Sequence, residues 1–160
     1  MMKDLKQDSN GVKSEAGNTP RVIVFACKWC GLIGADAAGR KHAQLPAGFR
    51  VIPVECASRI EADAVIRAFS SGIDGVIVLG CHLGGCRFNA ANHRTAKKLK
   101  LLYPLLETVG IDSKRFLLSF GTAHEHHQFE DLINRFYQGL QRLAPMDAWS
   151  GSYLSEMGQR

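Results

Sequence analysis

All five cysteines of this 160-residue chain lie at, or just beyond, the ends of hydrophobic runs. Cys27 and Cys30 close the run RVIVFACKWC, Cys56 closes RVIPVEC, and Cys81 and Cys86 close GVIVLGCHLGGC. In a parallel α/β sheet the carboxyl ends of the strands share one edge, and ligands bind there. The distribution therefore predicts one thiol cluster, and grouped thiols bind metal ions, bind iron–sulfur clusters or perform redox chemistry.

Thiolate sulfur is the soft donor that iron–sulfur centres select, and a 2Fe–2S cluster takes four such ligands. Five cysteines therefore leave one spare. Cys30 is the expected spare, because it lies beyond the end of the predicted strand, at the start of a helix. Gly80, Gly84 and Gly85 flank the last pair of cysteines. We expect them to let backbone N–H groups approach sulfur, and such hydrogen bonds raise the reduction potential of a cluster.

Three other chemistries use part of the same set. A structural zinc site takes four cysteines, although Cys56 stands alone here and a core of this size needs no zinc to fold. The CKWC segment at residues 27–30 has the form of a thioredoxin-type dithiol, which leaves the other three cysteines without a role. Cys81 and Arg87 have the spacing of the phosphate loop of cysteine-dependent phosphatases. Those enzymes place the loop after the first strand, whereas here it follows the third predicted strand. They also use the aspartate of an Asp-Pro pair as an acid, and this chain has no Asp-Pro pair.

The histidines fall near the same predicted edge of the sheet. His82 lies inside the last cysteine loop, where its ring could hydrogen-bond a sulfur or replace a cysteine as in Rieske-type centres. His124, His126 and His127 follow the fourth hydrophobic run. We interpret them as the polar start of a helix that is capped by Thr122, because threonine is a favoured N-cap residue.

The elements that must position these residues alternate along the chain. Short β-branched runs bounded by turn residues are typical of buried strands, and apolar residues at helical spacing are typical of helices. On this basis we predict strands at 21–26, 50–55, 75–80 and 116–120, and helices at 31–43, 61–71 and 89–109. A last helix follows the fourth strand, with apolar residues at helical spacing from Phe129 to Leu143. Four such units in sequence imply right-handed crossovers and helices on both faces, in a small Rossmann- or flavodoxin-like α/β domain with a four-stranded parallel sheet.

Two prolines and one glycine-rich segment refine this prediction. Pro53 lies within the second strand, and since proline lacks a ladder donor it places that strand at a sheet edge or bulge. Pro104 lies within the third helix and is expected to kink it or to start a new turn. The segment GLIGADAAG lacks the GxGxxG spacing and no P-loop motif occurs, so a flavin or nicotinamide bound by this chain is not expected.

A chain of this length is expected to form one domain. Residues 1–20 predict a flexible N-terminal tail, 21–144 the domain, and 145–160 a C-terminal tail that packs on a partner or stays unstructured. The N-terminus shows no apolar core of a secretory signal, and no run reaches the ~18–20 apolar residues of a membrane span. With an odd number of cysteines, we therefore expect a reducing cytoplasm and not a disulfide framework.

The net charge is +5, and much of the excess follows the last cysteine, at Arg87, Arg94, Lys97, Lys98 and Lys100. Such a run is a solvated helix face, a docking surface for an acidic partner, or a set of positive charges that compensates an anionic cluster. Nucleic acid is not the expected partner, because aromatic residues are not interleaved with these charges.

The segments that carry these residues resemble a known family. They are FACKWCGLIGADAAG, VECASRI, GVIVLGCHLGGCRFNAANHRTAKK and SFGTAHEHHQF, and the family is the delta (iron–sulfur) subunit of methyl-viologen-reducing hydrogenase. The resemblance implies an electron-transfer subunit with a 2Fe–2S cluster, which relays electrons from a hydrogenase or formate dehydrogenase to the flavin subunit of heterodisulfide reductase. Carried over by position, it implies ligands drawn from Cys27, Cys30, Cys56, Cys81 and Cys86. Leu83 departs from the proline expected in the last cysteine loop.

Overall fold

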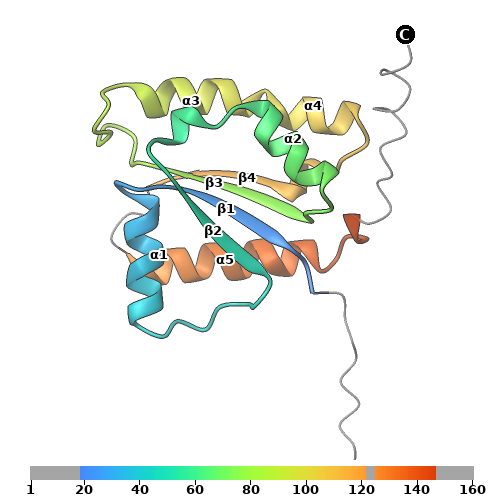
Figure 1. Ribbon diagram of the computed structural model, residues 1–160, viewed down its shortest axis with the longest axis horizontal. Coiled ribbons are helices and arrows are strands. Elements are labelled where there is room, and N and C mark those ends of the chain that lie inside the picture. The colour runs from blue at the N-terminus through green and yellow to red at the C-terminus, as the bar shows by residue number, and fades with distance from the viewer. Residues whose placement is uncertain (1–18, 122–124, 147–160) are drawn as a thin grey trace, which may run out of the picture.

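The chain forms a four-stranded parallel sheet with helices on both faces (Figure 1). The computed structural model describes residues 19–121 and 125–146. Its strands are β1 (Val22–Cys27), β2 (Phe49–Val54), β3 (Gly75–Gly80) and β4 (Phe116–Phe120). They lie in the order β2-β1-β3-β4, and each neighbouring pair is parallel. The α/β fold class expected from the sequence is therefore confirmed.

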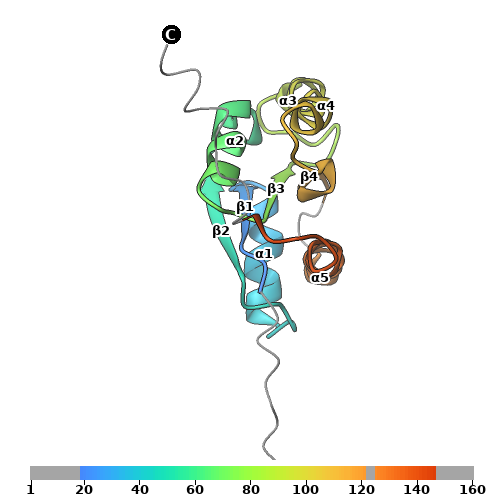
Figure 2. The same ribbon diagram turned by 90° about the vertical axis from the view of Figure 1, so that its right-hand side faces the viewer.

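The helices divide between the two faces of the sheet. One face carries α1 (Gly31–Arg40) and α5 (His126–Leu140), and the other carries α2 (Ala62–Ser70), α3 (Ala91–Lys100) and α4 (Leu102–Thr108) (Figure 2). Two short 3-10 helices, η1 (Ala57–Arg59) and η2 (Ser113–Arg115), precede α2 and β4. Each connection between consecutive strands contains a helix, as parallel crossovers require. None of the helices in the described segments is long and apolar enough to cross a membrane.

The central strand β3 contributes to the apolar cores on both faces, because successive side chains of a strand point to opposite sides of the sheet. Val76 and Val78 face the cluster formed with α2, α3 and α4, whereas Ile77 and Leu79 face the cluster formed with α5. Every residue of β3 is buried, which is the pattern of a strand covered on both faces. Burial of this apolar surface is the main favourable contribution to folding, and it gives the carboxyl ends of β1 and β3 a packed base.

Both proline predictions are confirmed. Pro53 pairs with Ala26, and β2 is an edge strand, so the missing N–H interrupts no further ladder. The predicted helix over 89–109 is divided at Leu101 into α3 and α4. Pro104 lies in the first turn of α4, where a backbone N–H has no partner within the helix and its absence is tolerated.

Several helix boundaries differ from the sequence prediction, and those of α1 and α5 matter most for the site. Helix α1 ends at Arg40, and α5 begins at His126 with Glu125 in the N-cap position. The prediction that Thr122 caps this helix is wrong. The N-cap residue directly precedes the first helical residue, and in α5 that residue is Glu125. Thr122 and His124 themselves lie outside the described residues.

The two ends of the described chain meet at the amino end of β3. The buried Asp74 carboxylate accepts hydrogen bonds from the backbone N–H groups of Arg21 (2.8 Å) and Met146 (2.9 Å). Arg115, also buried, donates to the carbonyl oxygens of Asp74 and Ala144. Apart from positions 19, 20, 145 and 146, the predicted tails at 1–20 and 145–160 lie outside the described residues.

Candidate metal centre

Two buried thiols meet at the carboxyl edge of the sheet. Cys27 is the last residue of β1, Cys81 follows β3, and these two strands are neighbours. The two Sγ atoms lie 3.5 Å apart, and the residues are 0% and 3% exposed. Two thiolates bound to one tetrahedral zinc ion at ~2.3 Å would lie ~3.8 Å apart. The spacing of Cys27 and Cys81 therefore fits two ligands of a common metal centre.

Cys30 lies beside this pair, at the N-cap position of α1. Burial, followed by hydrogen bonds that the protonated Cys81 thiol makes with Cys30 and Cys27, raises the pKa of Cys81 above the ordinary value for cysteine. Crowded thiols in an apolar setting resist deprotonation because their thiolates would be poorly solvated and would repel one another. A bound cation removes both penalties, so the chemistry of these donors suits a metal or an iron–sulfur cluster.

Cys56 and Cys86 lie on the flanking loops. Cys56 follows the end of β2 and is 7% exposed, and its sulfur accepts a hydrogen bond from Ser58 Oγ over 3.2 Å. Cys86 is half-buried and packs against the apolar cluster that contains Cys27 and Cys81. Within residues 19–121 and 125–146, no three His, Cys, Asp or Glu side chains are gathered closely enough to form a complete metal site. The structure therefore brings Cys27 and Cys81 into contact and places Cys30 beside Cys81. Cys56 and Cys86 lie on the loops that follow β2 and β3, and we call the loops around the thiol pair (27–30, 55–59 and 81–90) the rim.

Asn92 holds the last cysteine loop, and sequence reasoning missed this residue. Its side chain is 3% exposed. Nδ2 donates to the carbonyl oxygen of His82 over 2.8 Å, and Oδ1 accepts the backbone N–H of His93 over 2.9 Å. Asn92 and Thr95 are polar residues on the buried side of α3, which also includes Ala91. Polar residues within a buried helical stripe are the signal that could have identified this anchor.

Packing and backbone conformation account for two of the three glycines near the last cysteine pair, Gly80 and Gly84. A Cβ atom at Gly80 would come within 2.4 Å of the Phe120 ring, so this glycine makes room for a side chain of β4. Gly84 has φ +90°, a conformation that favours glycine, in the loop that leads to Cys86. Among the described residues, no backbone N–H donates to a cysteine sulfur. The expectation that these glycines bring N–H groups to sulfur is therefore not met.

A stacked pair on the surface joins two cysteine loops. The Arg87 guanidinium lies 4.1 Å from the centre of the Trp29 ring, which connects the loop at 81–90 to the loop at 27–30. Arg87 is thus engaged with an aromatic face, and the pKa of Cys81 is raised. A phosphatase nucleophile needs the opposite, a thiolate favoured by a lowered pKa. The geometry therefore gives no support to the phosphatase alternative.

The histidines do not contact sulfur in the described part of the chain. His82 is exposed, and its Nδ1 lies 3.2 Å from the carbonyl oxygen of Leu83, to which it donates when that nitrogen carries the proton. His127 faces the Glu125 carboxylate, with Nε2 3.4 Å from Oε2. These contacts are local to their own segments, and they leave the thiols as the donors of the candidate centre.

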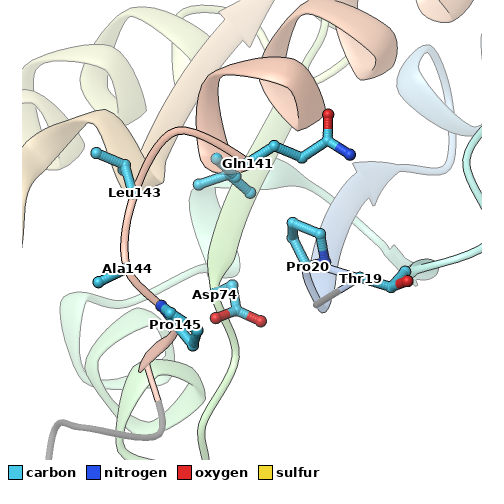
Figure 3. A pocket seen from close by; sticks show the side chains of 8 residues that line it. Thr19, Pro20, Asp74, Gln141, Leu143, Ala144 and Pro145 are labelled. Atoms are coloured by element: carbon cyan, nitrogen blue, oxygen red, sulfur yellow. The ribbon is translucent and has the colours of Figure 1, made fainter. Parts of the chain in front are cut away.

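A pocket of about 380 Å³ lies at the opposite end of the sheet, beside the amino end of β3 (Figure 3). Thr19 and Pro20 line it on one side and the turn at 143–145 on the other, with Asp74 between them. The Asp74 carboxylate already accepts two backbone hydrogen bonds there. This pocket lies where Asp74 binds the backbone of Arg21 and Met146, at the end of the sheet remote from the thiols.

Comparisons with known proteins find similarity to subunits of hydrogenases. A family model described as methyl-viologen-reducing hydrogenase, delta subunit, matches residues 22–144, which include all five cysteines. The iron-sulfur subunit of the F420-non-reducing hydrogenase vhc from Methanococcus voltae is 35% identical over 126 residues, which cover 79% of this chain and 88% of that protein. The iron-sulfur subunit of the F420-non-reducing hydrogenase from Archaeoglobus profundus is 34% identical over 126 residues, which cover 79% of this chain and 92% of that protein.

Another relative is a much longer chain. This protein of Methanosarcina acetivorans, which belongs to the Ferredoxin/F(420)H(2)-dependent CoB-CoM heterodisulfide reductase, is 31% identical over 127 residues. The match covers 79% of this chain and 16% of that protein. In that relative, the region similar to this chain is therefore one part of a larger polypeptide.

Proposed function

Because this chain belongs to the methyl-viologen-reducing hydrogenase delta subunit family, we propose that it is an electron-transfer subunit with a 2Fe–2S cluster at the carboxyl edge of its sheet. The observation that carries the proposal is the buried contact between the Cys27 and Cys81 thiols, 3.5 Å apart on neighbouring strands. Two relatives that span most of the chain are named iron–sulfur subunits of hydrogenases, which supports the same cofactor class.

Cys27 and Cys81 are the ligands that we propose as indispensable, since the fold already places their sulfurs together. Two of the remaining three thiols complete a set of four. Although Cys30 lies beside Cys81, we propose it as the spare because it lies beyond the strand end, at the start of α1. Cys56 and Cys86 are then the other two ligands. When bound, the cluster supplies reversible uptake of an electron. Zinc would use the same thiolates without redox chemistry, so the identity of the metal separates the two candidates.

The protein's own residues shield the thiols and fix the loops that carry them. Cys27 and Cys81 are buried within an apolar cluster, which keeps water from the sulfurs and strengthens electrostatic interactions there. Asn92 ties the start of the loop at 81–90 to α3. The backbone N–H of Lys28 donates to the Val54 carbonyl oxygen over 2.9 Å, which continues the pairing of β1 with β2 up to the rim. The thiols are therefore presented from a largely preformed frame.

Exposed apolar side chains surround the rim and support a protein partner at this edge. Trp29, Leu83 and Phe88 are 36%, 49% and 46% exposed, and all three lie on the loops that carry Cys30 and Cys86. Arg59 and Arg87 lie on the same rim, and neither has a carboxylate partner among the described residues. Apolar side chains mixed with arginine are typical of interface cores. We propose that this rim docks an acidic surface of the redox partner.

We propose that the partner is the flavin-containing subunit of a heterodisulfide-reductase-type complex, with a hydrogenase or formate dehydrogenase as the electron donor. The longer relative, which carries a similar region within a heterodisulfide reductase polypeptide, supports this choice because fusion places the two functions in one chain. We further propose a reducing cytoplasm as the compartment, since an odd number of thiols at one sheet edge suits cofactor binding and not disulfide bonds.

A reductive titration tests the proposed function. The full chain, purified without oxygen, is titrated with dithionite while the visible absorption is followed. We expect uptake of about one electron per chain together with bleaching of the visible bands. A chain that takes up no electrons, with a spectrum unchanged by dithionite, would exclude an electron-transfer role.

A further inference from the structure

One cysteine sulfur accepts a hydrogen bond from a hydroxyl group. Ser58 Oγ donates to Cys56 Sγ over 3.2 Å, within η1, the short helix that follows β2. Cys56 is 7% exposed and Ser58 is half-buried, so bulk water competes weakly for this bond. Among the described residues, no other side-chain hydroxyl donates to a cysteine. The contact is therefore specific to the thiol that stands alone in the sequence.

The position of Ser58 is fixed from two sides. The backbone N–H of Arg59 donates to the Cys56 carbonyl oxygen over 3.0 Å, which closes the turn that returns the Ser58 hydroxyl to residue 56. From α3, Lys98 Nζ donates to the Ser58 carbonyl oxygen over 3.3 Å and pairs with the Glu61 carboxylate at 2.8 Å. The hydroxyl is thus aimed at sulfur by a tethered backbone.

We propose that Ser58 sets the reduction potential of the cluster by donating a hydrogen bond to the thiolate of Cys56. This inference rests on the proposed function with Cys56 as a ligand. Reduction adds negative charge that the ligand sulfurs share, and an O–H donor stabilises the more negative state. Hydrogen bonds to charged acceptors are stronger than those between neutral groups. Ser58 acts through Cys56 and is not itself a ligand.

The expected effect follows from the loss of this donor. Ser58→Ala is expected to shift the one-electron reduction equilibrium toward the oxidised form by about three- to tenfold, which is ~30–60 mV at 59 mV per tenfold for one electron. Ser58→Thr keeps a hydroxyl and is expected to keep the wild-type potential. Ser71→Ala is the matched control, since the Ser71 hydroxyl donates to the Arg67 carbonyl oxygen over 2.9 Å, away from the thiols.

A redox titration of the full chain, followed by electron paramagnetic resonance with iron measured on each sample, tests the inference. Equal potentials in wild type and Ser58→Ala at equal iron content would overturn it and leave the proposed function standing. A lowered potential that Ser58→Thr fails to restore would also overturn it. A wild-type chain without iron would overturn the proposed function and this inference together.

A second pair of variants keeps the test decisive where Ser58→Ala does not fold. Threonine and valine have nearly the same shape and differ in one hydroxyl, so Ser58→Thr and Ser58→Val isolate the hydrogen bond from packing. We expect the lower potential in Ser58→Val. The same potential in both variants, with the same iron content, would contradict the role of the hydroxyl.

Discussion

Replacing Asn92 by alanine removes the side chain that fastens the loop at 81–90 to α3. The buried amide donates to the His82 carbonyl oxygen over 2.8 Å and accepts the His93 N–H over 2.9 Å. Each hydrogen bond contributes about 0.5–1.5 kcal/mol net, and a buried group left without a partner costs about 1–3 kcal/mol. We therefore expect Asn92→Ala to lower the free energy of unfolding by about 2–3 kcal/mol.

Urea denaturation of the full chain without metal, under reducing conditions and followed by circular dichroism, measures this free energy. Asn134→Ala is the matched control, because the Asn134 amide donates to the Gln44 carbonyl oxygen over 3.1 Å in an exposed position. Its expected change is below about 0.5 kcal/mol. Asn92→Asp keeps an acceptor for the His93 N–H and loses the donor to His82, so it separates the two bonds. Equal stability of Asn92→Ala and Asn134→Ala would refute the anchoring role.

The remaining predictions concern the thiols, the rim and the core. Cys27→Ser and Cys81→Ser each remove one member of the thiol pair, so we expect both to abolish iron binding. Cys30→Ser is expected to keep the visible spectrum of the wild type. Loss of that spectrum would show that Cys30 is a ligand. Arg87→Glu reverses a charge on the rim, so we expect slower electron transfer to the flavin subunit in stopped-flow mixing, most strongly at low salt. The control is Lys41→Glu, at the far end of α1, and equal rates in the two variants would place docking elsewhere. Burial raises the pKa of Tyr137, so the folded chain holds the phenol proton more tightly than the unfolded chain. The resulting contribution to the free energy of unfolding is fully present below about pH 10, the ordinary pKa of tyrosine, and is lost as the pH rises through the pKa of the folded state. We expect the free energy of unfolding, measured in urea, to fall less steeply between about pH 9 and about pH 11 in Tyr137→Phe than in the wild type. Equal pH profiles of the two proteins would contradict the role of Tyr137.

The strands could be predicted well because their signal is local. The strands at 75–80 and 116–120 have the predicted bounds, since each is an apolar run between turn or polar residues. The edge position of β2 followed from Pro53, because a missing donor is tolerated only where no partner strand needs it. The contact of Cys27 with Cys81 followed from the rule that parallel strands end at one edge.

The contacts that fix the loops could not be predicted, because they join segments far apart in the chain. Lys98 reaches the carbonyl oxygen of Ser58 from another helix, and Asp74 binds the backbone of Met146. No short pattern encodes such pairs. The role of Gly80 was likewise hidden, since it depends on the Phe120 ring of the neighbouring strand. The sequence pattern of the strands therefore predicts where the thiols lie, whereas the side chains that fix the cysteine loops depend on tertiary packing.

The proposal that the thiols hold a 2Fe–2S cluster is tested most directly by metal and sulfide analysis of the full chain purified without oxygen. We expect brown protein with about two iron atoms and about two acid-labile sulfides per chain. Colourless protein with about one zinc ion per chain and no sulfide would contradict the proposal.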